Sequence, residues 1–310
     1  MKKYLITGGC GFIGSHLVDN LIENYDCEII VIDNLSAQSN ERFYFNGSGR
    51  VKYFSNDIRD YATIEPLFKG VDVVVHLAAE SRIQPVIDKP QLAVEVNALG
   101  TCNVLEACRK HGVKRMVYSS TSSSYGLKNC SPLNEDMQTD CLTPYSFSKV
   151  AGEEFCKMYW KLWNIETITL RYFNVYGERQ PLKGHYAPVV GKFFDQKFRG
   201  LPLTVIGDGT QKRDFTYIND VTKANIEAMF TTNKKAFGEI FNIGTGTNIS
   251  ILELAKYIDK GDNIVYIEKR QGETHETLAN VTKARDILSW SHSVSIEEWI
   301  DRVLKTGKFY

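Results

Sequence analysis

Short runs of apolar, mostly β-branched residues recur along the chain and are separated by segments with helical periodicity. The runs are continuously hydrophobic instead of alternating, which is typical of parallel strands buried on both faces of a sheet. The predicted strands cover residues 4–7, 28–33, 51–55, 71–77, 115–119 and 167–173. Strands that alternate with helices in this way predict an α/β fold built on a doubly wound parallel sheet.

Three segments between and after these strands are predicted as helices. Apolar residues recur three or four positions apart after the first strand, at Ile13, Leu17, Val18, Leu21 and Ile22. A second helical pattern covers residues 94–108. A third begins at Tyr145 and contains neither Gly nor Pro after Gly152. These periodicities predict helices that cover the sheet.

The alternation of strands and helices weakens after about Gly177. Charged residues with Gly and Pro open this region at 179–184, whereas the strand-like segment 239–243 is expected to return to the sheet edge. We therefore predict a Rossmann domain formed by residues 1–174 and 219–246. A smaller C-terminal substrate lobe is predicted from residues 175–218 and 247–310.

Composition excludes several classes of protein. The 310 residues contain 37 Lys and Arg and 37 Asp and Glu, and this zero net charge argues against a nucleic-acid or anionic membrane partner. The seven cysteines are scattered without a C-x-x-C pair, which indicates reduced thiols and no metal site. No apolar run approaches 18 residues, and the N-terminus reaches a glycine loop too early for a signal peptide. We expect a soluble cytoplasmic protein.

A glycine-rich loop, Gly8-Gly9-Cys10-Gly11-Phe12-Ile13-Gly14, follows the first predicted strand and opens the first helix. Such a turn lets a pyrophosphate approach the backbone and the helix N-terminus. Asp33 ends the second strand, 19 residues beyond Gly14. A carboxylate there binds the adenosine ribose hydroxyls and repels a 2′-phosphate, which favours NAD over NADP.

Two further polar positions end predicted strands. Asp57, before Ile58, could hold the adenine edge, although an ordinary strand-end aspartate is an open alternative. His76 would lie over the cofactor crevice, where a hydrogen-bonded core histidine is favoured over a catalytic one.

Tyr145 and Lys149 are four residues apart, so on a helix their side chains share one face. An ammonium beside a phenol favours the phenolate and lowers a pKa that starts near ~10. The pair is therefore a candidate general base, with a solvated helix face as the alternative.

The ordered motifs resemble the extended short-chain dehydrogenase/reductases, in particular their NAD-dependent nucleotide-sugar epimerase/dehydratase branch. The resemblance covers nearly the whole chain. Besides the glycine loop it rests on Asp33, Asp57-Ile58, His76-Leu77-Ala78-Ala79, Asn97, Ser119-Ser120-Thr121, Tyr145-x-x-x-Lys149, Arg171-Tyr172-Phe173-Asn174-Val175-Tyr176-Gly177 and Arg213-Asp214-Phe215. It implies bound NAD, a sugar-nucleotide lobe, and a homodimer built on the helices near 97–110 and 145–162.

The resemblance also implies residue roles. Thr121 would hydrogen-bond the sugar hydroxyl that is oxidised, Tyr145 would be the base, and Lys149 would bind the nicotinamide ribose. The implied NAD-binding set is Gly8, Gly11, Phe12, Ile13, Gly14, Asp33, Asn34, Asp57, Ile58, Leu77, Ala78, Ala79, Asn97, Ser119, Tyr145 and Lys149. The implied substrate-binding set is Ser81, Arg82, Thr121, Ser122, Ser123, Asn174, Arg179, Arg213, Arg270 and Thr277. Asn174 could instead be a turn cap, and the arginines could form surface ion pairs.

Two positions discriminate within the family. Ser122 and Ser123 stand where the 4,6-dehydratases have an Asp-Glu pair and the UDP-glucuronate decarboxylases have a Glu at the second place. A hydroxyl cannot transfer protons as a carboxylate does near neutral pH, so a 4-epimerase that forms a transient 4-keto sugar fits best. A serine-rich turn without chemistry is the alternative for Ser122–Ser124.

Thr277 aligns with a large aromatic residue of the UDP-galactose epimerases and would leave room for an N-acetyl group. We therefore predict a UDP-hexose substrate of the N-acetylglucosamine or glucose type. Because Arg82 or Arg179 could receive a carboxylate, a UDP-glucuronate 4-epimerase is the first alternative. An NADP-dependent keto-sugar reductase and a non-catalytic dinucleotide-sensing protein are the others. Asn280 departs from the family, which usually has Asp there.

Overall fold

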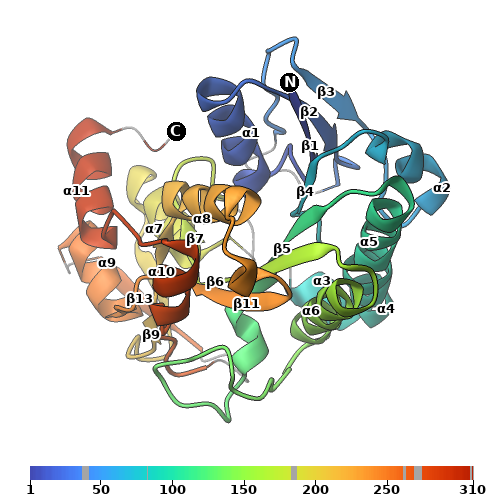
Figure 1. Ribbon diagram of the computed structural model, residues 1–310. Helices are drawn as coiled ribbons and strands as arrows, with labels where there is room; N and C mark the ends of the chain where they lie inside the picture. Colours follow the sequence, from blue (N-terminus) through green and yellow to red (C-terminus); the bar gives the residue numbers. More distant parts are fainter. Residues whose placement is uncertain are drawn as a thin grey trace.

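Seven parallel strands form the central sheet of the computed structural model, which describes residues 1–36, 42–81, 83–182, 187–260, 263–268, 274–307 and 309 (Figure 1). Their spatial order is β11-β6-β5-β4-β1-β2-β3. They span Lys2–Thr7 (β1), Cys27–Ile32 (β2), Val51–Phe54 (β3), Val73–His76 (β4), Arg115–Thr121 (β5), Glu166–Tyr172 (β6) and Glu239–Ile243 (β11). The predicted doubly wound sheet is confirmed, including the return of residues 239–243 to its edge beside β6.

Helices cover both faces of this sheet, and alternate residues of each strand contact opposite layers. Tyr4 and Ile6 of β1 pack with α1 (Phe12–Asn24) and α8 (Ile218–Phe230). Leu5 faces the other layer. That layer holds α2 (Tyr61–Ile64), α3 (Ile83–Asp88), α4 (Pro90–Ala93), α5 (Gly100–His111) and α6 (Pro144–Trp163). Burial on both faces explains why the strand sequences are continuously apolar.

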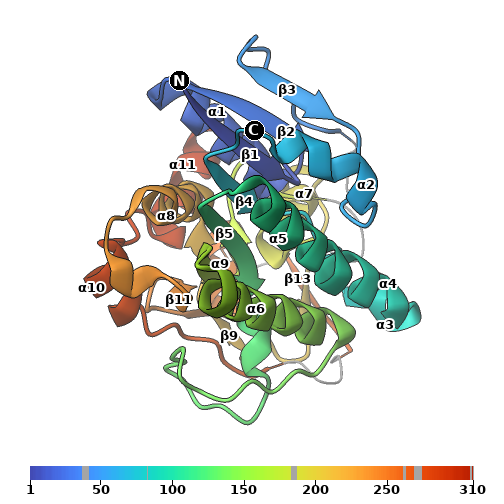
Figure 2. The same ribbon diagram turned by 45° about the vertical axis from the view of Figure 1, so that its right-hand side comes forward.

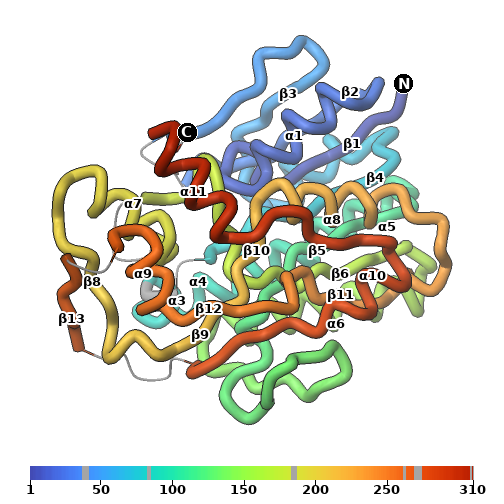
Figure 3. The backbone as a smooth tube through the Cα atoms, turned by 90° about the vertical axis from the view of Figure 1, so that its left-hand side faces the viewer, coloured from blue at the N-terminus to red at the C-terminus, as the bar shows by residue number. Residues whose placement is uncertain are grey.

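The C-terminal part lies beside the sheet (Figure 3). Its side chains build a second hydrophobic cluster. Its centre is aromatic: Phe194, Trp299 and Phe309 lie with ring centroids 5.1–5.5 Å apart. Its elements are β7 (Val175–Tyr176), α7 (Val189–Phe198), β8 (Leu203–Ile206), β9 (Lys212–Arg213), β10 (Thr216–Tyr217), β12 (Ile249–Ser250), α9 (Ile251–Asp259), β13 (Ile264–Ile267) and α11 (Ile296–Thr306). Six of these pair as short two-stranded sheets, β10 with β7, β12 with β9 and β13 with β8.

Helix α10 (Thr282–Leu288) does not follow the division into lobes proposed above. Ala284 and Leu288, with the nearby Trp290, pack into the cluster that contains α1, α8 and the sheet. The helix therefore belongs to the larger lobe by its packing, because its apolar residues meet α8 and β11. Among the described residues, no helix has both the length and the apolarity needed to cross a membrane.

Candidate active site

The glycine loop joins β1 to α1 at the point where the strand order reverses, which is where ligands bind in such sheets. Gly8 adopts a φ of 73°, and a Cβ there would lie 2.8 Å from the Ala78 amide nitrogen. A Cβ at Gly14 would collide with the Gly8 carbonyl oxygen. At Gly11, by contrast, a Cβ would meet its nearest protein atom at an ordinary 3.5 Å.

Gly11 is also the N-cap of α1 and provides no side-chain cap, so the first amides of the helix stay available to a ligand. Phe12 and Ile13 begin the helix, and Ile13 packs against both large hydrophobic clusters. The loop therefore fits the pyrophosphate of a dinucleotide, because open space and free amides coincide at Gly11.

Asp33 follows β2 and fixes the shape of this loop. Its carboxylate accepts hydrogen bonds from the amides of Cys10 (3.0 Å) and Leu35 (2.9 Å). Burial raises the pKa of Asp33, and these two amides act in the opposite direction. The carboxylate is only partly covered, so its outer side can still meet a ribose.

Asp57 forms an ion pair with Arg59 at 2.8 Å and accepts a hydrogen bond from Asn34 at 2.9 Å. The Arg59 bonds lower its pKa to about 2. These contacts join Asn34, which follows β2, and Asp57, which follows β3, in one network. Ile58 is buried beside it.

His76 is a fully buried histidine with both ring nitrogens beside a hydroxyl. Its Nδ1 lies 2.6 Å from the Thr7 hydroxyl and its Nε2 lies 2.9 Å from the Thr101 hydroxyl. Burial lowers its pKa to about 3, so the ring is neutral. Immediately after it, the Leu77 and Ala78 amides bond to Thr7, which sets Leu77, Ala78 and Ala79 over the glycine loop.

The helix that carries the Tyr-Lys pair begins with a capping box. Thr143 accepts a hydrogen bond from the Ser146 amide, the Ser146 hydroxyl accepts one from the Thr143 amide, and Pro144 occupies the first turn. These bonds fix Tyr145 in the first turn of α6, next to the end of β5. Tyr145 is half-buried, and its side chain hydrogen-bonds to the hydroxyl of Thr121, the last residue of β5.

The pKa values of the pair differ from the sequence prediction. Burial raises the pKa of Tyr145, and only the Thr121 hydroxyl opposes that rise. The expected lowering by Lys149 is therefore wrong for the protein alone, because desolvation dominates. Burial lowers the pKa of Lys149 to about 7, and the electrostatic effects of Cys156 and Glu153 oppose this lowering only in part. Lys149 is 2% exposed, and its Nζ has no hydrogen-bond partner among the residues the structure describes.

The serine-rich turn after Thr121 is a 3₁₀ helix (Ser122–Tyr125). Thr121 caps it by accepting the Ser123 amide at 3.1 Å, and the Ser124 hydroxyl donates back to the Thr121 carbonyl. Ser122 is half-buried and Ser123 is exposed, so both hydroxyls remain on the accessible side, whereas Ser124 is structural. Ser119 lies two residues earlier in β5.

Asn97 lies in a π-helical stretch (Val94–Leu99), a geometry that occurs frequently at functional sites. Its side-chain amide accepts a hydrogen bond from the Glu80 amide and donates one to the Glu80 carbonyl. It also donates to the Ser148 hydroxyl at 3.0 Å. Ser148 in turn donates to the Tyr145 carbonyl. Asn97 thus connects the loop after β4 to α6, and Ser148 is a connecting residue that the sequence analysis did not identify.

A buried ion pair lies one turn beyond Lys149. Glu153 accepts two hydrogen bonds from Arg171 of β6, at 2.8 and 2.7 Å, and one from Ser120 at 2.6 Å. Both charged side chains are at most 2% exposed. Because Ser120 adjoins Thr121, this network fixes the end of β5 against α6. Its signal in the sequence was a carboxylate four residues after Lys149.

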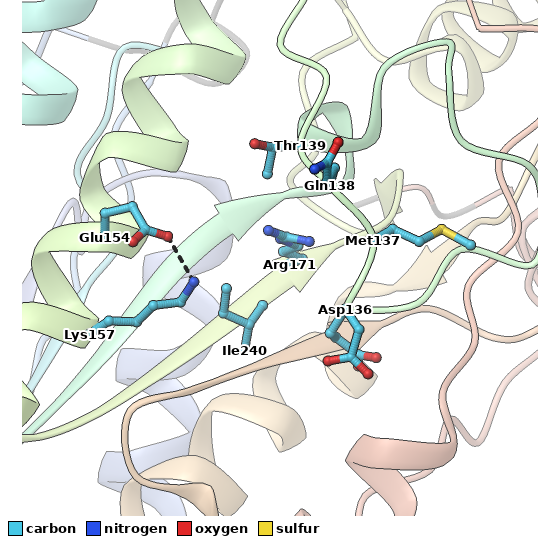
Figure 4. A pocket seen from close by; sticks show the side chains of 9 residues that line it. Asp136, Met137, Gln138, Thr139, Glu154, Lys157, Arg171 and Ile240 are labelled. Carbon is cyan, nitrogen blue, oxygen red and sulfur yellow. Dashed lines mark hydrogen bonds and ion pairs between the residues drawn. The ribbon is translucent and has the colours of Figure 1, made fainter.

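Arg171 also lines a separate pocket of about 510 Å³, where it lies between the Glu154–Lys157 ion pair and Met137 (Figure 4). None of the predicted cofactor or substrate residues lines this pocket. Three acidic side chains, Glu135, Asp136 and Glu154, contribute to its wall. It is therefore distinct from the site at the glycine loop.

On the side predicted to bind the sugar nucleotide, called the sugar side below, Asn174 and Thr277 come together around Asp214. Asn174 donates to the Asp214 carbonyl at 2.8 Å and approaches the Thr277 hydroxyl at 3.4 Å. The buried Asp214 carboxylate accepts four hydrogen bonds, from the Thr245 amide and hydroxyl and from the Gly246 and Ala279 amides. Burial raises its pKa, against these bonds. Asp214 thus holds the segments that carry Arg213 and Thr277.

The remaining predicted substrate residues are less tightly grouped. Arg179 has an Nη2 atom 2.6 Å from Asp19 of α1, and its guanidinium lies over the Tyr44 ring. These contacts direct the Arg179 guanidinium to α1 and to the segment after β2. Ser81 is exposed. Arg82 and Arg270 lie outside the described residues.

Comparison with known proteins defines the family. A profile of the GDP-mannose 4,6 dehydratase family matches residues 5–303. The chain belongs to this family. It is one of the extended short-chain dehydrogenase/reductases, as its motifs suggested.

Several members of the family are similar over almost their full length. A Methanocaldococcus jannaschii protein provisionally named a UDP-glucose 4-epimerase is 39% identical, with 98% of each chain covered. The UDP-N-acetylglucosamine 4-epimerase from Methanobrevibacter ruminantium M1, solved with UDP-N-acetylmuramic acid, is 31% identical over 98% of this chain and 97% of its own, with a TM-score of 0.90. The UDP-glucuronic acid 4-epimerase from Bacillus cereus, solved with UDP-glucuronic acid and NAD, is 32% identical over 96% of each chain, with a TM-score of 0.85.

The arrangement supports acid-base chemistry on a hydroxyl beside a dinucleotide. Thr121 ends β5, Tyr145 lies in the first turn of α6 beside it, and Lys149 lies one turn further along α6. In this family member no carboxylate stands at positions 122 and 123. No cluster of three or more His, Cys, Asp or Glu side chains able to hold a metal occurs in the described part of the chain.

Proposed function

We propose that this chain is a UDP-hexose 4-epimerase that works with bound NAD through a transient 4-keto sugar. The observation that carries the proposal is the combination of Thr121, Tyr145 and Lys149 at the crevice with hydroxyls at Ser122 and Ser123. The first three residues can oxidise and reduce a sugar carbon. The two serines lack the carboxylates that elimination or the related decarboxylation would use.

The cofactor assignment is supported by three features of the chain. The loop around Gly11 leaves space and free amides for a pyrophosphate, and Asp33 presents a partly covered carboxylate toward the ribose position. The Lys149 ammonium is buried without a described hydrogen-bond partner, which suits ribose hydroxyls as acceptors. Bound NAD would supply the hydride acceptor and donor for C4.

In the proposed reaction, Tyr145 acts as a phenolate, which the positive charge of bound NAD beside it would favour against the burial that raises its pKa. The phenolate accepts the proton of the C4 hydroxyl while Thr121 orients that hydroxyl. The hydride leaves C4, and the resulting 4-keto sugar rotates so that its other face meets the cofactor. The hydride then returns to C4 and Tyr145 gives the proton back, so atoms and electrons balance over the cycle. Sugar-nucleotide contacts from Asn174 and Arg213 would hold the UDP part during the rotation.

For the sugar, we propose an N-acetyl or neutral hexose, with UDP-N-acetylglucosamine ahead of UDP-glucose. Thr277 supports this preference because it is small and its hydroxyl is held at Asn174 and Asp214, so it leaves space at C2. UDP-glucuronate is the second candidate substrate, because the 32% identical structure from Bacillus cereus is a UDP-glucuronic acid 4-epimerase. The engagement of Arg179 with Asp19 weighs against Arg179 as the carboxylate ligand.

We further propose a homodimer through the outer face of α5 and α6, which lie side by side (Figure 2). Phe147, Met158 and Leu162 form one exposed apolar stripe on α6, and Val94 and Leu99 are exposed on the adjoining π-helical stretch. All seven cysteines are unpaired, which supports a reducing, cytoplasmic location.

The assay is to incubate the protein with UDP-N-acetylglucosamine, UDP-glucose and UDP-glucuronate separately, without added cofactor, and to look for C4 epimers by NMR. Inversion of the N-acetyl or neutral sugar is expected. If only UDP-glucuronate is inverted at C4, the alternative function, a UDP-glucuronate 4-epimerase, is supported instead. A 4-keto-6-deoxy sugar formed from UDP-N-acetylglucosamine or UDP-glucose, or a decarboxylated sugar formed from UDP-glucuronate, would contradict the roles given to Ser122 and Ser123.

A further inference from the structure

We propose that the aromatic ring of Tyr118 is the positioning partner of Lys149, and that it holds the ammonium in place through a cation–π contact. This inference rests on the function proposed for Lys149. The Lys149 Nζ lies 4.4 Å from the centre of the Tyr118 ring. A cation within about 6 Å of a ring centroid is attracted by the negative face of the ring.

The need for such a partner follows from the burial of Lys149. A buried ammonium without compensation is strongly disfavoured, and no described residue accepts a hydrogen bond from its Nζ. The ring face of Tyr118 is therefore the stabilising contact that the protein itself supplies. Unlike a carboxylate, a ring leaves the three N–H donors of the ammonium free for a ligand.

Three neighbouring groups fix the position of the Tyr118 ring. Tyr118 is fully buried, and its hydroxyl donates to the Lys149 backbone carbonyl at 3.2 Å. The His76 ring lies against it with centroids 5.7 Å apart. Gly152, on α6, makes the close approach possible, because a Cβ there would collide with the Tyr118 hydroxyl. The glycine between Lys149 and Glu153 is thus explained by the ring.

The charged and titratable groups around Lys149 do not replace the ring. They are Tyr145, Glu153 and Cys156 on α6, His76 on β4, Tyr118 on β5 and, through Glu153, Arg171 on β6. Glu153 is engaged by two hydrogen bonds from Arg171, and His76 is neutral. Burial raises the pKa of Tyr118 well above its usual value, so the ring does not compete as a base. Burial lowers the pKa of Lys149 to about 7, which separates its titration from that of exposed lysines.

The test changes the ring electronics and keeps its shape. Tyr118→Phe is the reference, and 4-fluoro-, 3,5-difluoro- and 3,4,5-trifluorophenylalanine are then placed at position 118. Each fluorine weakens the negative potential of the ring face. The titration of Lys149 is followed by NMR of ¹³Cε-labelled lysine in the protein as purified, with cofactor content matched. Its resonance is assigned by its loss in Lys149→Met, and exposed lysines titrate near ~10.4.

We expect the titration midpoint of Lys149 to fall stepwise with each fluorine, by about half a unit to one unit across the series. The matched control is the same fluorinated series at Phe68, which is buried in the same hydrophobic cluster and is expected to shift nothing. Equal midpoints for all rings at 118, or an equal shift from the Phe68 series, would overturn the proposal. The pH profile of kcat is recorded alongside. Absence of any epimerisation by the wild type would refute the proposed function, while the NMR result would still decide the role of Tyr118.

Discussion

The two sides of the candidate site are built in different ways. The cofactor side is carried by long elements of the sheet and by α6, and buried networks hold its residues, such as Asn97 with Ser148 and Glu153 with Arg171. The sugar side is carried by strands of two residues, β9 and β12, and by an isolated bridge at Glu276. Its residues Asn174 and Thr277 are held mainly to the neighbouring Asp214. This difference suggests that the framework fixes the chemistry and the short segments choose the sugar.

The largest effect is expected from breaking the buried pair on the cofactor side. Glu153→Gln leaves the Arg171 charge buried without its partner, which should lower the free energy of unfolding by about 3–5 kcal/mol. The matched control is Asp195→Asn, which breaks the more exposed pair with Arg199 and should cost at most about 1 kcal/mol. Denaturant unfolding measures both. If the two variants lose similar free energies of unfolding, the buried pair contributes no more to stability than the surface pair, and the contrast drawn above is wrong.

Loss of the base should affect activity more than any sugar-side change. Tyr145→Phe is expected to lower kcat at least ~100-fold, because it removes the phenol oxygen that is proposed to take the proton. Thr121→Val should be milder and Thr121→Ser nearly silent, since serine keeps the hydroxyl. NAD content is measured in each variant. A Tyr145→Phe enzyme that retains most of its activity would require another base.

A sugar-side substitution should change preference and leave the chemistry intact. Thr277→Tyr is expected to lower kcat/KM for UDP-N-acetylglucosamine by about tenfold relative to UDP-glucose, because the larger ring fills the space beside C2. Thr277→Ser serves as the control and should keep the ratio. An equal loss on both sugars would place Thr277 in the structural support of Asp214 and not at the sugar.

The smallest predicted effect is a gain in stability at the cofactor side. Burial lowers the pKa of Lys149 to about 7 from 10.5, so between these pH values the unfolded chain binds more protons than the folded chain. Stability therefore rises with pH across this window. In cofactor-free protein, Lys149→Met should raise the free energy of unfolding at pH 7 by about 1 kcal/mol or more. The gain should shrink at pH 9, and a gain that is independent of pH would contradict the shifted titration.

The framework could be predicted from the sequence because each part of it has a local signal. Parallel strands show as continuous apolar runs, and the loop from Gly8 to Gly14 shows as glycines at fixed intervals. The pKa of Tyr145 could not be predicted, since it depends on burial by residues distant in sequence. The engagement of Arg179 with Asp19, 160 residues earlier, is hidden for the same reason. Tyr118 carried no signal because its role depends on the packing of β5 against α6.

The most direct test of the account follows the hydrogen at C4. The protein is incubated in ordinary water with UDP-N-acetylglucosamine or UDP-glucose deuterated at C4, and the product is examined by NMR and mass spectrometry. The account predicts a C4 epimer that keeps its deuterium, because the hydride leaves and returns on the same bound cofactor. An inverted product that has exchanged the deuterium for solvent hydrogen would contradict hydride transfer, and the absence of inversion in either sugar would contradict the proposed substrate.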